Sequence, residues 1–120
     1  MAFLRRRRGG SRRNAELDED QRSLLQLQAA RANLGLARHV IHNLSFDNGT
    51  DARSAAAVVE RAGWEVSVSA PTGEEERWAV RAEGLRVVDP TTVGAFRSWF
   101  ERVAAEGRGT YEGWEAAAKP

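Results

Sequence analysis

The chain has 120 residues, which is the size of one domain and leaves little material for a second core. It contains no cysteine, so disulfides and thiolate metal sites are excluded. No apolar run approaches the roughly 18 residues that a membrane-spanning helix needs. The basic N-terminus lacks the apolar region of a signal peptide, and these features together predict a soluble cytoplasmic protein.

The net charge of +1 conceals a basic segment joined to an acidic body. Six of the 18 basic residues precede residue 14, and the remaining 12 are outnumbered by 17 acidic residues. An acidic body repels nucleic acid and favours a basic protein partner, whereas a basic arm can hold phosphates without reading sequence. Arginine replaces lysine almost throughout and alanine is abundant, a usage that suggests a bacterial source. The basic arm consists of Arg5, Arg6, Arg7, Arg8, Arg12 and Arg13.

The N-terminal third divides into two predicted units. Residues 1–14 are mostly arginine, glycine, serine and asparagine without periodicity, and we expect them to form a disordered arm. Residues 15–36 carry acids in the first turn and helix-forming residues thereafter, which predicts an N-terminal helix that ends near Gly35. Its apolar stripe is modest, so this helix should pack on another element.

The third unit, residues 37–118, opens with an alternating strand and a helix. In "RHVIHNLSF" one side of the predicted strand is more apolar than the other. A helix follows, with Thr50 as its predicted N-cap, alanine and valine at helical spacing, and Gly63 just beyond its end. The apolar side of the strand carries Val40, His42, Leu44 and Phe46, and the other side carries His39, Ile41, Asn43 and Ser45.

The rest of this unit is predicted to form a hairpin, a helix and a last strand. "WEVSVSA" and "RWAVRAE" alternate on either side of the polar turn "PTGEEE". Asp89 and Pro90 then supply an N-cap and a first-turn proline for the most apolar helix. "TYEGWEA" is a short final strand, in which a bulge at Gly113 would bring Tyr111 and Trp114 to the same side.

The order of these elements predicts an α+β fold of the ferredoxin-like βαββαβ type, preceded by the N-terminal helix. The sheet should be four-stranded and antiparallel, with both long helices on one face and the last strand at an edge beside the first. Ile41 on the opposite face suggests partial cover there by the N-terminal helix.

Candidate residues for catalysis are few. His39 and His42 lie three apart on a strand and therefore face opposite sides, so they cannot chelate one ion. Three consecutive glutamates in the hairpin turn are typical of a solvated loop and lack the spacing of a cation site. A phosphate-binding loop and a nucleophile elbow are both missing from the sequence. We therefore expect no enzyme, with no catalytic, cofactor-binding or metal-binding residues.

Two other classes of function deserve comparison. Many RNA-binding domains have a ferredoxin-like sheet and stack bases on aromatic residues of the central strands. The outward positions predicted here carry no phenylalanine, tyrosine or tryptophan, so only the arginine arm offers an RNA contact. A small-molecule regulatory domain of the same fold would need a dimer and a ligand pocket, neither of which the sequence shows.

Several segments carry a family resemblance. "RHVIHNLSF", "AAAVVERAGWEV", the aromatic third strand and "TYEGWEA" resemble the RraB family of ribonuclease E regulators, over about residues 38–116. The terminal run Tyr111, Glu112, Gly113 and Trp114 is the most specific part. The resemblance implies a ferredoxin-like domain without catalytic residues or cofactor, which binds ribonuclease E and lowers its cleavage of RNA.

The sequence thus predicts a non-enzymatic regulator that binds ribonuclease E, or another basic RNA-processing protein, through its acidic body. The alternative is an RNA-associated protein that binds phosphates through the arginine arm. The predicted partner-binding residues are acidic and expected to be exposed: Glu74, Glu75, Glu76 and Glu112.

Overall fold

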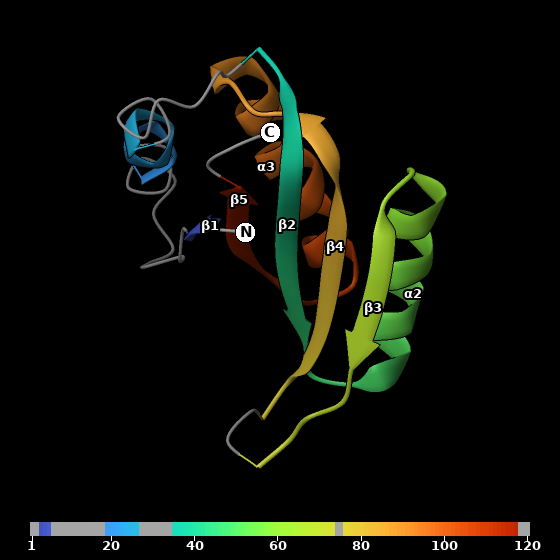
Figure 1. Cartoon of the computed structure of the whole chain (residues 1–120). Coiled ribbons are helices and arrows are strands. Elements are labelled where there is room, and N and C mark those ends of the chain that lie inside the picture. Colours follow the sequence, from blue (N-terminus) through green and yellow to red (C-terminus); the bar gives the residue numbers. More distant parts are fainter. Residues whose placement is uncertain (1–2, 6–18, 27–34, 74–75, 118–120) are drawn as a thin grey trace.

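The computed structural model describes residues 3–5, 19–26, 35–73 and 76–117. Its strands form one antiparallel sheet in the order β1-β5-β2-β4-β3. Figure 1 shows α2 and α3 on the same face of this sheet, which confirms the ferredoxin-like arrangement. In chain order the elements are β1 (Phe3–Arg5), a helical segment at residues 19–26, β2 (Ala37–Phe46), α2 (Gly49–Arg61), β3 (Glu65–Ser69), β4 (Trp78–Val87), α3 (Pro90–Glu106) and β5 (Thr110–Ala117).

The outer edge of the sheet differs from the prediction, because β5 is not an edge strand. The three-residue strand β1 pairs with it, and Arg5 lies opposite Glu115 in the register. Residues 3–5 fall within the segment predicted to be disordered, and the remaining arm residues lie outside the described part of the chain. The composition of this segment does not indicate a strand, because so short a strand forms only by pairing with a neighbouring strand.

The described part of the predicted N-terminal helix, residues 19–26, packs beside α3. Ile41 on the opposite face is 2% exposed, and its partial cover by this helix stays a prediction, because residues 27–34 lie outside the described part of the chain. Asp20 of this segment forms a buried ion pair with Arg97 of α3 and accepts a hydrogen bond from Trp114 of β5. Leu24 packs in a cluster with Val93 of α3. The segment therefore extends the helical layer of the sandwich.

Local capping signals explain where the two long helices begin and end. The predicted cap of α2 is displaced by two residues, because the N-cap is Asn48 and not Thr50. At the start of α3, Asp89 accepts from the Thr92 amide at 2.9 Å and the Thr92 hydroxyl accepts from the Asp89 amide, a complete capping box. Gly63 follows α2 with a φ of +98°, the left-handed conformation that favours glycine.

Two groups of buried apolar residues fill the space between sheet and helices. The main cluster lies between α2, α3 and the sheet, and the N-terminal cluster lies where the 19–26 segment meets α3 and β5. The main cluster contains Leu44, Phe46, Ala52, Ala55, Ala56, Val59, Trp64, Val80, Ala82, Phe100, Val103, Ala104 and Tyr111. The N-terminal cluster contains Leu24, Val40, Val88, Val93, Trp114 and Ala116.

A bulge in β5 connects the two clusters. Leu44 pairs with Tyr111 while Asn43 pairs with Gly113, so Glu112 is an extra residue in the ladder. Gly113 has a φ of +109°, which most side chains rarely adopt. The bulge places Tyr111 in the main cluster and Trp114 in the N-terminal cluster, both beneath the helices, as the sequence predicted.

Candidate protein-binding surface

The two histidines lie on opposite faces of β2, as their spacing predicted. Nε2 of His39 is 3.0 Å from a carboxylate oxygen of Glu83 on the face away from the helices. His42 points toward the helices and is 1% exposed. Within the described residues, no group of three or more histidine and acidic side chains is arranged to hold a metal ion.

His42 lies at the centre of an aromatic cluster. Its ring stacks on Phe100 with 4.1 Å between centroids, and Trp64 and Phe96 present their rings at steep angles to it. Its Nδ1 and the hydroxyl of Tyr111 share a hydrogen bond of 2.8 Å, whereas its buried Nε2 has no hydrogen-bond partner among the described residues. Burial, with a smaller contribution from nearby arginine charges, lowers the pKa of His42 to about 3. The imidazole is therefore neutral near pH 7 and packs as part of the core.

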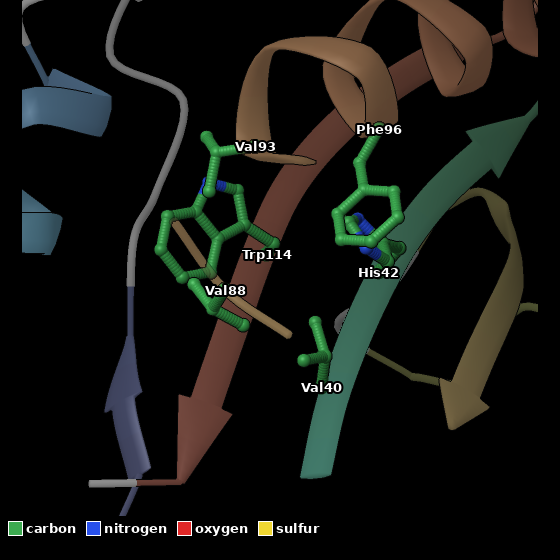
Figure 2. Close-up of a pocket in the computed structure, with 6 residues that line it drawn as sticks. All are labelled: Val40, His42, Val88, Val93, Phe96 and Trp114. Carbon is green, nitrogen blue, oxygen red and sulfur yellow. The ribbon is translucent and has the colours of Figure 1, made fainter. Parts of the chain in front are cut away.

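A narrow pocket lies beside this imidazole, beneath α3. Figure 2 shows its lining, to which β2, α3 and β5 all contribute. The pocket is too narrow to admit a water molecule, and its lining is apolar apart from the neutral ring of His42 and the indole of Trp114. Nothing in this lining is a nucleophile or a charged group. The lining residues are Val40, His42, Val88, Val93, Phe96 and Trp114.

The opposite face of the sheet carries a row of carboxylates. In the strand register, Ile41 of β2 lies between Glu83 of β4 and Glu115 of β5, and Glu83 in turn pairs with Glu65 of β3. Side chains that lie directly across neighbouring strands share one face. We call this surface the open face; its acidic row consists of Glu65, Glu83 and Glu115.

Glu83 of this row contacts two basic side chains. Nε of Arg81 lies 2.6 Å from a carboxylate oxygen of Glu83, which also contacts His39. Glu65 is exposed, whereas Glu115 is largely buried. Ile41 is 2% exposed, so the middle of the open face is covered and its β3 side is accessible.

Two of the four predicted contact residues lie at one end of the sheet. Glu112 is exposed at the bulge and accepts a 2.7 Å hydrogen bond from the Ser45 hydroxyl. The Arg77 guanidinium donates to the carbonyl oxygen of Ser45 and to the hydroxyl of Thr110, which brings the exposed Glu76 of the hairpin to the same end. Glu74 and Glu75 lie outside the described residues.

Only one residue of the basic arm falls in the described part of the chain, and in the strand register it lies opposite Glu115 of the acidic row. Arg5 belongs to β1, whereas Arg6, Arg7, Arg8, Arg12 and Arg13 lie outside the described residues. Along β2 to β5, the open-face positions that pair across the strands hold no phenylalanine, tyrosine or tryptophan. These four strands therefore do not present the row of large aromatic rings on which RNA-binding domains of this topology stack bases.

Comparison with known proteins identifies the domain. A family model described as regulator of ribonuclease activity B, RraB, matches residues 17–116. The chain belongs to the RraB family. A search of curated proteins found no match. The match includes the N-terminal segment that contributes Asp20 and the strands from β2 onward, except for Ala117 at the end of β5.

The family assignment agrees with a regulatory role, and it rests on most of the folded chain. Every residue of the acidic row lies inside the matched range. None of the helices in the described parts of this RraB domain is long and apolar enough to cross a membrane.

The sequence interpretation missed part of this surface. Glu65 and Glu115 join Glu83 on the open face, and strand alternation alone could have placed Glu65 there, since it precedes the inward Val66. Glu115 could not be placed without the register of the bulge. The buried pair of Asp20 and Arg97 joins residues 77 positions apart, and no local pattern indicates such a contact.

Proposed function

We propose that this RraB protein is a non-catalytic regulator that binds ribonuclease E, or a related RNA-processing enzyme, in the bacterial cytoplasm and lowers its cleavage of RNA. The observation that carries the proposal is the family match over residues 17–116. The apolar lining of the pocket beneath α3 and the burial of His42 support a binding role over a catalytic one.

The proposed contact surface is the open face together with the sheet end that carries Glu76 and Glu112. Both glutamates are exposed, and Glu65 adds a third accessible carboxylate on the same face. A basic segment of the ribonuclease would meet complementary charge there, which speeds association and favours the correct partner. Because the glutamates are exposed, we expect the affinity to fall as salt increases.

The test is cleavage of a defined RNA by ribonuclease E from the same organism, with and without the purified protein. We expect slower cleavage and co-purification of the two proteins. The double variant Glu76→Arg, Glu112→Arg should weaken binding by roughly tenfold or more, since it reverses two charges at the proposed contact. Glu106→Arg is the matched control, because Glu106 is exposed at the end of α3 on the helical layer.

Unchanged cleavage without co-purification would contradict the proposed function. Inhibition that is equally sensitive to Glu106→Arg would leave the function standing and reject the proposed surface. In the alternative function, RNA binds to the arginine arm. Replacing the arginines at positions 6–8, 12 and 13 with glutamine should then abolish RNA retention. These substitutions keep β1, which deletion of residues 1–14 would remove.

A further inference from the structure

The strands at the two sides of the sheet differ in how they are paired. On one side β5 is covered by β1 and interrupted by the bulge at Glu112. On the other side β3 pairs with β4 alone, in a continuous register from Glu65 to Ser69. Figure 1 shows β3 as the outermost strand of the sheet. An edge strand presents unpaired backbone groups that can pair with another chain.

The centre of the β3 edge carries no charge, proline or bulge that would blunt such pairing. Natural edge strands are blunted by lysine, proline, bulges or inward-pointing charges. The sequence of β3, EVSVS, has only Glu65 as a charged residue, and it lies at the strand's beginning. Val66 and Val68 face the helical layer but are incompletely covered, and 37% of the surface of Val68 is exposed.

The sequence of β3 is complementary to itself in the antiparallel sense. If two copies of the strand pair about a two-fold axis at Ser67, then Val66 of one copy lies opposite Val68 of the other. Glu65 then lies opposite Ser69, so no like charges meet. The two valine pairs would share the helical side of the joined sheet, and β-branched pairs stabilise neighbouring strands.

The flank of α2 beside this edge has complementary charges with the same symmetry. The Arg53 guanidinium lies over the ring of Trp78 in β4, which shows that this flank of α2 is near the β3–β4 hairpin. Glu60 follows seven residues later, about two helical turns, and therefore lies on the same flank. A two-fold axis reverses the direction of α2, which would bring Arg53 of one copy near Glu60 of the other.

We propose that the protein forms a symmetric dimer by antiparallel pairing of β3 with β3 of a second copy. The partner is a second copy because the centre of the edge is uncharged and its sequence is self-complementary. The joined sheet has the open faces of both copies on one side. A closed two-fold contact of this kind uses the same surface on each subunit.

Sedimentation of the full chain over a range of concentrations tests this proposal. We expect a monomer at low concentration and a dimer at high concentration. Val68→Lys should weaken association about tenfold or more, because it adds an inward-pointing charge at the edge. Leu85→Lys is the control, since Leu85 is 66% exposed on the central strand β4. Circular dichroism checks that each variant remains folded.

Charge reversal gives a second, independent readout. Arg53→Glu and Glu60→Arg should each weaken the dimer, and the double variant should restore it, because only a symmetric pair recovers opposite charges when both are exchanged. A chain that stays monomeric at the highest concentration would overturn the proposal. So would a dimer that Val68→Lys leaves intact, or one that Leu85→Lys weakens equally.

Discussion

The two buried clusters of this protein are held together by different physical interactions. The main cluster is built from aromatic and aliphatic side chains around one neutral hydrogen bond, between His42 and Tyr111. The N-terminal cluster is smaller and is closed by a buried ion pair between Asp20 and Arg97. The central core is thus held mainly by apolar and aromatic packing around a neutral hydrogen bond, whereas the N-terminal cluster is closed by a charged contact.

The ion pair is well formed for a buried contact. Arg97 donates to both carboxylate oxygens of Asp20, at 2.5 and 2.7 Å, and the indole of Trp114 donates to one of them at 3.1 Å. Burial alone would lower the pKa of Arg97, but the hydrogen bonds and charge of Asp20 outweigh it, and the pKa is raised. Arg97 therefore stays charged, and its removal would leave a buried carboxylate without its main partner.

The largest effect on stability is expected from removal of this ion pair. Arg97→Ala should lower the free energy of unfolding by about 3–5 kcal/mol, measured by urea denaturation, because the charge of Asp20 remains buried. The apolar double variant Asp20→Leu, Arg97→Met should recover much of this loss, since it removes both charges and keeps volume. If the double variant is as unstable as the single one, the ion pair is not what distinguishes the N-terminal cluster.

A pH series tests the main cluster. The pKa of His42 is about 3 in the folded protein, below its ordinary value near 6.5 in the unfolded chain. The stabilisation from the neutral ring is complete above pH 6.5 and is lost as the pH falls toward 3, since the unfolded chain gains a proton that the folded one does not. Between pH 7 and 5 this loss amounts to about 2 kcal/mol.

The measurement is the unfolding free energy of wild type and His42→Gln at several pH values in this window. The glutamine variant retains a group that can hydrogen-bond to Tyr111 but does not titrate, so its pH dependence should be shallower. His39→Gln shows how much of the slope belongs to the other histidine. Equal slopes for wild type and His42→Gln would mean that the main cluster tolerates a charged imidazole.

The smallest expected effect concerns the bulge between the clusters. Gly113→Ala should cost about 1–2 kcal/mol, because alanine is strained at a φ of +109°. Tyr111 and Trp114 belong to different clusters, so a shift in the bulge should disturb both, seen as changes in tryptophan fluorescence and in thermal unfolding. Gly73→Ala is the control, because a Cβ there meets no atom within 4 Å. Equal stability of the two variants would argue against the bulge as the connection.

Local signals in the sequence predicted most of the fold. Alternation in "RHVIHNLSF" placed Val40, His42 and Leu44 on the buried side of β2, as found. Asp89 and Pro90 marked the start of α3, and Gly63 marked the end of α2. These features depend on residues only a few positions away in the chain. A short stretch of sequence is therefore enough to predict them.

The candidate surface was predicted only in part, because it brings together residues that are far apart in the chain. Glu76 and Glu112 lie at one end of the sheet as exposed acids, but the acidic row needed the pairing of four strands to become visible. Glu115 in particular reaches the open face only because the bulge shifts the alternation by one residue. Gly113 indicated the bulge in the sequence, but its pairing with β2 decided which residues it brings to the open face.

The sequence by itself determined the order of elements from β2 to β5, the buried side of β2, the end of α2 and the start of α3, because each follows from short-range sterics and periodicity. Tertiary structure alone decided that β1 pairs with β5, that the N-terminal segment joins the helical layer and that Asp20 meets Arg97. These contacts join residues far apart in the chain, and their stability comes from desolvation and register in the assembled sandwich.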